Sequence, residues 1–99
     1  MKVVVLEDAA EDLERGRRFY ESCEVGVGDY FSESLLSDLD SLVLFAGIHP
    51  LYFRFHRMVS KRFPFGIYYE VEDDLAYVYA ILDLRRDPLW IRSQLKKRR

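Results

Sequence analysis

The stretch that decides the fold, residues 61–88, reads KRFPFGIYYEVEDDLAYVYAILDLRRDP. Pro64 cannot donate a hydrogen bond to a neighbouring strand, so it belongs at the start or edge of a strand. Phe65–Val71 is predicted to be a strand, with Phe65, Ile67, Tyr69 and Val71 on one face and Gly66, Tyr68 and Glu70 on the other. The polar segment Glu72–Asp74 predicts a hairpin turn. Leu75–Asp83 is almost continuously apolar, as in a central strand that is covered on both sides.

Another strand is expected before this stretch and a helix after it. The composition of Tyr52–Val59 predicts a strand, and the chain must turn within Ser60–Pro64. Asp87 and Pro88 are residue types preferred at the N-cap and the first position of a helix. The segment therefore predicts a three-stranded antiparallel meander and a C-terminal helix. The residues expected to pack this helix down are Trp90, Ile91 and Leu95.

The first half of the chain predicts a short strand and two helices. Residues 2–6 are apolar and mostly β-branched, as in a strand. Asp8 is a suitable N-cap for a helix that runs to Cys23. Asp29 is a suitable N-cap for a second helix, which ends before Gly47.

Gly26 and Gly28 are expected to break the chain between these helices, which then form an antiparallel hairpin. The first helix presents an apolar stripe of Ala9, Leu13, Gly16, Tyr20 and Cys23. The second buries Phe31, Leu35, Leu39, Leu42 and either Phe45 or Ala46. Its expected water-facing residues are Ser32, Glu33, Ser37, Asp38 and Ser41. We predict one α+β domain over residues 1–99, with the order β-α-α-β-β-β-α and a mostly antiparallel sheet.

Composition excludes several classes of protein. Hydrophobic residues make up 49% of the 99 residues, enough for a core without disulfides. Cys23 is the single cysteine, and we expect it to be a small buried hydrophobe. No spacing of cysteine or histidine suggests a metal site, and no cofactor is expected. Without an apolar run long enough for a membrane span or a signal peptide, the expected location is the cytoplasm.

Charge is distributed unevenly along the chain. Residues 1–50 carry four basic and eleven acidic side chains, a net charge of −7, whereas residues 51–99 carry eleven and six, a net charge of +5. Such asymmetry either marks a face that attracts polyanions or an acidic partner, or is the ordinary unevenness of a small protein. The pI of about 5.7 argues against unspecific binding of nucleic acid.

Basic residues concentrate in the second half and define the candidate binding site. These residues, with one tyrosine beside them, are Arg54, His56, Arg57, Lys61, Arg62, Tyr68, Arg85 and Arg86. A strand with such side chains could neutralise a phosphate backbone and stack a base, or it could be a solvated sheet face. Adjacent residues of an extended segment point to opposite sides, so only one of the paired arginines can share a face with His56.

Acid–base chemistry at this site would need a group that titrates near neutral pH, and His56 is the only one there whose ordinary pKa is suitable. If RNA were cleaved, His56 or Lys61 could take the 2′-hydroxyl proton while Arg54 or Arg86 stabilised the phosphate. The sequence contains no GxSxG, HExxH or phosphate-binding glycine loop.

The segments RFPFGIYYEVEDD and AYVYAILDLRRDP, with the motif Phe63–Tyr69 and Arg85–Pro88, resemble toxins of the RelE/ParE superfamily of type II toxin–antitoxin, or plasmid-stabilisation, systems. The resemblance covers nearly the whole chain. It implies a bacterial toxin that is held inactive by a cognate antitoxin.

Members of the RelE branch cleave messenger RNA on the ribosome with a basic cluster and a tyrosine, whereas ParE-like members poison DNA gyrase without catalytic residues. Carried over to this sequence, the ribonuclease candidates are Arg57, Lys61, Arg86 and His56. Gly66, however, occupies a position where the ribonuclease branch commonly has arginine, and no tyrosine follows Arg86. The resemblance therefore favours a ParE-like inhibitor; the alternatives are a ribonuclease and a non-toxic relic that only binds its partner.

The expected partners are an antitoxin, DNA gyrase or the ribosome, and a second copy of the chain in a homodimer. An open sheet edge could accept a strand from a partner. The side chains that could anchor a partner, or that could equally belong to the core, are Phe53, Phe55 and Trp90.

Overall fold

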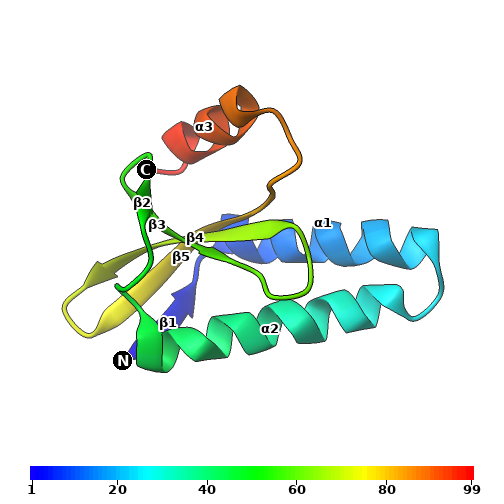
Figure 1. The fold of residues 1–99 in the computed structure, drawn as a ribbon, viewed down its shortest axis with the longest axis horizontal. Coiled ribbons are helices and arrows are strands. Elements are labelled where there is room, and N and C mark those ends of the chain that lie inside the picture. Colours follow the sequence, from blue (N-terminus) through cyan, green and yellow to red (C-terminus); the bar gives the residue numbers. More distant parts are fainter.

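The computed structural model describes all 99 residues and confirms the α+β class (Figure 1). In chain order the elements are β1 (Lys2–Val5), α1 (Glu7–Cys23), α2 (Val27–Phe45), β2 (Leu51–Tyr52), β3 (Phe55–Val59), β4 (Phe65–Glu72), β5 (Leu75–Asp83) and α3 (Pro88–Lys97). None of the helices combines the length and apolar character that a membrane crossing requires.

All five strands form one sheet in the order β1-β5-β4-β3-β2. The predicted antiparallel meander is β3-β4-β5, with Ile67 of β4 between Met58 and Ile81 of its two neighbours. The N-terminal strand β1 lies parallel to β5, from Lys2 opposite Leu75 to Val5 opposite Val78. β5 is therefore an interior strand, as its apolar sequence predicted.

The predicted single strand over Tyr52–Val59 is wrong, because a hairpin divides it into β2 and β3. Tyr52 pairs with Phe55, which leaves Phe53 and Arg54 as a two-residue loop. Both have positive φ, 52° and 73°, as a type I′ turn requires. This turn favours Asn-Gly, whereas a bulky residue with positive φ is strained.

The strain predicts that the double substitution Phe53→Asn and Arg54→Gly will stabilise the protein. Relief at two left-handed positions is expected to raise the free energy of unfolding by about 1–2 kcal/mol. Urea denaturation followed by circular dichroism measures this change. The same pair of residue types at the exposed positions Lys61 and Arg62, neither of which has positive φ, is the control and should give no such gain.

Helices cover both faces of the sheet (Figure 1). The hairpin of α1 and α2 packs on one face, and α3 packs on the other. Successive residues of β4 alternate between them: Ile67 and Tyr69 lie in the core under the hairpin, and Tyr68 lies under α3. The larger core consists of Ala9, Phe31, Leu35, Leu39, Leu42, Met58, Phe65, Ile67, Tyr69, Ala76, Val78 and Ile81. The smaller consists of Phe55, Tyr68, Ala80, Leu82, Ile91 and Leu95.

The junction between α1 and α2 differs from the prediction. Gly26 does separate the helices, with a φ of 93°, but Gly28 lies inside α2. The N-terminus of α2 is capped from the other helix: the Glu21 carboxylate accepts the backbone N–H groups of Gly26 and Gly28 at 3.0–3.1 Å. Asp29 is therefore within α2 and is not its N-cap.

Other predicted caps and burial patterns have mixed outcomes. α1 begins at Glu7, one residue before Asp8, and its N-cap is Leu6. Asp87 does cap α3, since its carboxylate accepts the N–H of Leu89 at 2.8 Å. The predicted burial of Cys23 is wrong, because the helix turns it to solvent.

Asp38 was expected to face water but is buried, and it links α2 to the loop after β3. Its Oδ2 accepts a hydrogen bond from the Ser60 hydroxyl at 2.6 Å, and both residues are at most 6% exposed. A buried carboxylate needs such a donor, because desolvation without a hydrogen bond is costly.

Candidate binding site

The strand β3 presents its predicted site residues on opposite faces of the sheet. Arg57 lies on the α3 face, opposite Tyr68 of β4, with its guanidinium carbon 3.7 Å from the ring centroid of Tyr52. Its Nε is buried and has no hydrogen-bond partner. Tyr68 is 1% exposed, so its ring offers no open face to a base, and burial raises the pKa of its hydroxyl.

His56 lies on the helix-hairpin face, where it stacks on Tyr69 with ring centroids 5.1 Å apart. Its Nδ1 is 2.7 Å from the carbonyl oxygen of His49, so Nδ1 carries the proton and donates it. The alternation of the strand therefore separates His56 from Arg57, and the two do not form one acid–base and phosphate-binding cluster.

The Tyr69 hydroxyl joins the same cluster to the end of α2. It accepts the N–H of Gly47 at 2.9 Å, and it is hydrogen-bonded to His49 Nδ1. Burial, assisted by the nearby His56, lowers the pKa of His49.

This arrangement predicts how stability depends on pH. In the unfolded chain His49 titrates near pH 6.5, about its ordinary value, and in the folded protein it titrates lower. Below about pH 6.5 the unfolded state therefore binds a proton that the native state does not, so the free energy of unfolding falls as the pH falls. His49→Asn should make this decline shallower between about pH 7 and 5 in urea titrations. His56→Asn removes only the smaller cause of the lowered His49 pKa and should flatten the decline less; an equal flattening in both variants would contradict the assignment to His49.

The paired arginines after β5 have separate roles. Arg85 is held by Asp83, with Nε to Oδ1 at 3.0 Å and Nη2 to Oδ2 at 2.8 Å. This hydrogen-bonded guanidinium keeps the pKa of the Asp83 carboxyl below its usual value. Arg86 stacks on Trp90, with its guanidinium carbon 3.7 Å from the ring centroid. Both residues line a cavity of about 280 Å³ between α1, β5 and the start of α3.

The predicted basic residues are thus spread over several elements. Lys61 and Arg62 are exposed in the loop between β3 and β4 and form no ion pair. Arg57 is in β3, Lys61 is in the loop after it, and Arg86 lies between β5 and α3. Gly66 also has little room for a side chain, since a Cβ there would lie 2.9 Å from Leu84 Cδ2 and 3.3 Å from Arg57 Cδ.

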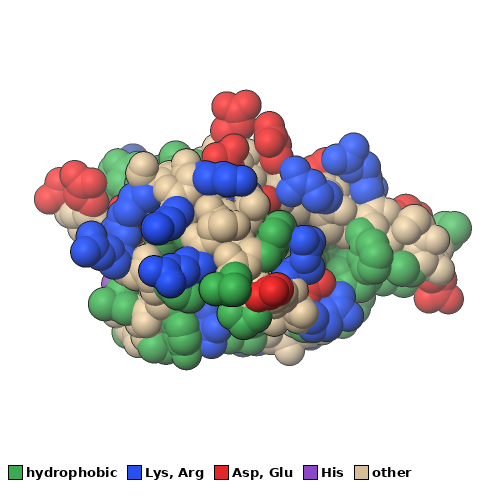
Figure 2. Space-filling view, turned by 90° about the horizontal axis from the view of Figure 1, so that it is seen from above, with side chains coloured by type: hydrophobic (Ala, Val, Ile, Leu, Met, Phe, Trp, Pro, Cys, Tyr) green, Lys and Arg blue, Asp and Glu red, His purple; other side chains and the backbone are tan.

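A different group of cations meets around a groove between α3 and the β2–β3 turn. This basic groove has a volume of about 370 Å³ and is lined by the cations Arg54, Arg92, Lys96 and Arg99. Its apolar lining is Phe53, Phe55 and Leu95. Figure 2 looks onto the α3 side and shows Lys and Arg side chains gathered at the left of the view, with hydrophobic side chains among them. Of these four cations only Arg54 was among the predicted site residues; Arg92 and Lys96 of α3, and Arg99 just after it, were not.

The helical spacing of Arg92 and Lys96 was the signal that could have identified part of the groove. Residues four apart lie on one side of a helix, whereas Arg99 follows the end of α3. Of the expected partner anchors, Phe55 is core, Trp90 of α3 is half-buried against the smaller core, and Phe53 is 46% exposed at the groove.

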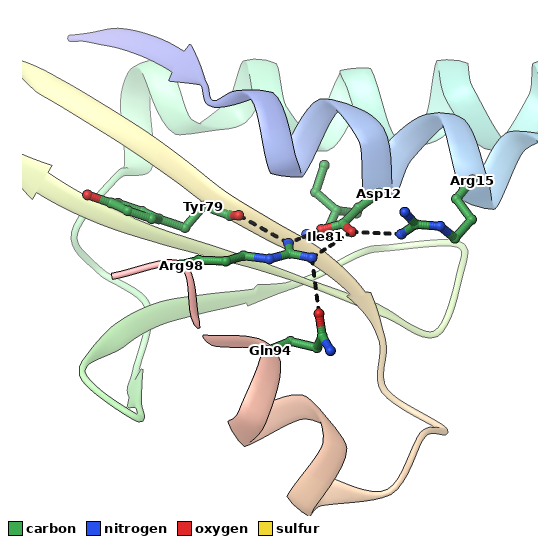
Figure 3. A network of polar contacts seen from close by, with 6 residues as sticks. All are labelled: Asp12, Arg15, Tyr79, Ile81, Gln94 and Arg98. Carbon is green, nitrogen blue, oxygen red and sulfur yellow. Dashed lines mark hydrogen bonds and ion pairs between the residues drawn. The ribbon is translucent and has the colours of Figure 1, made fainter. Parts of the chain in front are cut away.

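Behind the groove, Asp12 and Arg98 close the outer edge of β5 (Figure 3). β1 pairs with β5 only as far as Val78, so the following edge has no neighbouring strand. There, Asp12 Oδ2 accepts the N–H of Ile81 at 3.0 Å, and Arg98 donates to the carbonyl of Tyr79 at 3.3 Å.

Arg98 also donates from Nη1 and Nη2, its two terminal guanidinium nitrogens, to the two carboxylate oxygens of Asp12. Side-chain exposure is 2% for Asp12 and 11% for Arg98. The network thus joins α1, β5 and the end of α3, and it blocks this part of the sheet edge to a partner strand.

Comparison with known proteins gives one structural likeness. No protein-family model matches the sequence, and no curated protein matches it. The fold is similar to a chain of the solved structure described as the chromosomal ParDE TA (toxin–antitoxin) system from P. aeruginosa. The TM-score is 0.77 at 16% sequence identity, and the match covers 85% of this chain and 96% of that chain. The chain therefore has a fold found in a toxin–antitoxin complex.

Proposed function

We propose that this protein is the toxin of a toxin–antitoxin pair and that it acts in the ParE manner, by binding and inhibiting an essential target, DNA gyrase. The observation that carries the proposal is the fold match to the ParDE system, which extends over most of both chains. The sequence resemblance of Phe63–Tyr69 and Arg85–Pro88 points to the same superfamily. A cognate antitoxin and a cytoplasmic location follow from the proposal.

Two features favour inhibition by binding over RNA cleavage. Gly66 stands where the ribonuclease branch commonly has arginine, so that catalytic side chain is absent. The candidate acid–base group His56 is on the other face of the sheet from Arg57 and is engaged with His49 and Tyr69. General acid–base catalysis requires these groups to reach one substrate.

Gyrase supercoiling with purified protein tests the proposed target. The expected result is dose-dependent loss of supercoiled product, while topoisomerase I relaxation, as a control for DNA damage, is unchanged. Unaltered supercoiling at a large molar excess of folded protein would contradict gyrase as the target.

The same preparation tests the ribonuclease alternative in a bacterial translation extract. We expect transcripts to stay intact. Cleavage by the wild type that is lost in Arg57→Ala, Lys61→Ala and Arg86→Ala would replace the proposal by a ribosome-dependent ribonuclease.

A further inference from the structure

The cavity of about 280 Å³ lies against the outer edge of β5, beyond Val78, where β1 stops pairing. We call it the edge cavity. Its lining comes from α1, from the end of β5 and from the start of α3. Asp12 and Arg15 lie side by side on α1 at this edge (Figure 3). The other lining residues that matter here are Phe19, Asp83, Arg86 and Trp90.

The two carboxylates in the lining are already paired with arginines that do not line the cavity. Both oxygens of Asp12 accept hydrogen bonds from Arg98, and both oxygens of Asp83 accept hydrogen bonds from Arg85. Counted with these partners, the charged lining consists of four arginines and two aspartates, a net charge of +2. The edge cavity therefore favours an anion.

Arg86 is the cation of the cavity that has no anionic partner. It forms no ion pair, and the face of its guanidinium lies on the Trp90 ring. Stacking uses the face of a guanidinium and leaves the N–H groups at its edge free to bind a carboxylate. Arg15 also has free donors, because only its Nη1 is bonded to Asp12, at 3.2 Å, and its side chain is 67% exposed.

Aromatic rings supply much of the apolar lining. Phe19 is 54% exposed, Trp90 is half-buried, and Phe65 is only 6% exposed. An exposed phenylalanine leaves apolar surface in water, and a planar ring placed against it would remove that surface from water. The lining thus combines aromatic surface with two cations that have free donors.

We propose that the edge cavity binds a small aromatic anion, a compound of one or two rings that bears a carboxylate. The carboxylate accepts hydrogen bonds from Arg15 and Arg86, and the rings contact Phe19 and Trp90. A small molecule fits better than an added strand of a protein, because Asp12 and Arg98 already bond the free edge of β5 at Ile81 and Tyr79. The volume is also near the lower end of the range for small-molecule sites.

Trp90 is the single tryptophan of the chain, so its indole N–H signal in ¹H–¹⁵N NMR spectra reports on the edge cavity. Purified protein is titrated with sodium 2-naphthoate, and a ligand of this size is expected to have a Kd of about 0.1–1 mM. The Trp90 signal and the amide signals of Gly16 and Asp83, which also line the cavity, should move together.

Two comparison ligands separate the contributions of charge and ring. 2-Naphthylmethylammonium keeps the rings and reverses the charge, whereas cyclohexanecarboxylate keeps the charge and lacks an aromatic ring. Each should bind at least about fivefold more weakly than 2-naphthoate, because each loses one of the two kinds of contact.

A pair of charge variants locates the binding on the protein. Arg15→Gln with Arg86→Gln should raise the Kd of 2-naphthoate about tenfold or more, through the lost charged hydrogen bonds. The matched control is Arg18→Gln with Arg92→Gln, which removes the same charge at exposed residues outside the cavity and should change the Kd little. All four side chains are exposed, so both variants should keep the fold.

Three outcomes would overturn the inference. The first is an unchanged Trp90 signal at about 10 mM 2-naphthoate, well above the expected Kd. The second is equally tight binding of the ammonium compound, and the third is an equal loss of affinity in both charge variants. The titration measures binding by purified protein, so its result is independent of toxicity and of the gyrase assay.

Discussion

Asp12→Ala is expected to destabilise the protein by about 3–5 kcal/mol, the cost of leaving a buried charge without its partner. Asp12 is the acceptor for Arg98, for the N–H of Ile81 and, at 3.2 Å, for Arg15. Without the Asp12 carboxylate, the buried Arg98 guanidinium has no anionic partner, and the N–H of Ile81 at the edge of β5 has no acceptor. Small domains have only about 5–15 kcal/mol of stability, so a large fraction would be lost.

Urea denaturation of Asp12→Ala measures this cost, and two further variants identify its origin. Glu14→Ala removes the exposed ion pair with Arg17 on the same helix and should leave the denaturation midpoint nearly unchanged. Asp12→Leu combined with Arg98→Met removes both charges and should recover part of the stability that Asp12→Ala loses. A loss below about 1 kcal/mol for Asp12→Ala would show that the network contributes little.

Gly28→Ala is expected to destabilise the protein by about 1–3 kcal/mol through overpacking. A Cβ at residue 28 would lie 2.6 Å from the backbone carbonyl oxygen of Arg17 and 2.8 Å from Glu21 Cβ. Backbone cannot yield as a flexible side chain can, so α1 and α2 would have to separate. The Glu21 carboxylate that caps α2 would move with them.

The direction of the change in stability distinguishes overpacking from helix propensity. Alanine normally stabilises a helix relative to glycine, by up to about 1 kcal/mol. Thermal or urea unfolding of Gly28→Ala compared with wild type therefore separates close helix packing from helix propensity. Ser37→Ala, at an exposed position of α2, is the control and should change stability little. A more stable Gly28→Ala protein would contradict the close approach of the two helices.

Local patterns predicted most of the secondary structure, because the information lay within a few residues. The structure confirms the strands predicted at β4 and β5 and the predicted cap Asp87–Pro88. The β2–β3 hairpin was missed because its turn carries Phe53 and Arg54, residue types that do not indicate a type I′ turn. The rest of the fold holds these two residues in a strained backbone conformation, which the local sequence cannot indicate.

Long-range pairings were also beyond prediction. The sequence could not reveal that β1 lies parallel to β5, that Asp38 reaches Ser60, or that Asp12 meets Arg98, 86 residues later. Asp38 was expected on the water-facing side of its helix, and Ser60 was expected in a turn. The candidate site was predicted only in part for the same reason: Arg54 and the cations of α3 meet through tertiary packing.

The central claim is that the chain is a toxin, and growth of bacteria that carry no cognate antitoxin tests it most directly. The chain is expressed from a tightly repressed promoter, with empty vector and the destabilised Asp12→Ala variant as controls, and viable counts are followed after induction. We expect induction of the wild type to stop growth, and Asp12→Ala to be less toxic in proportion to its loss of folded protein. Unimpaired growth while folded wild-type protein accumulates would contradict the claim and identify a protein that only binds its partner.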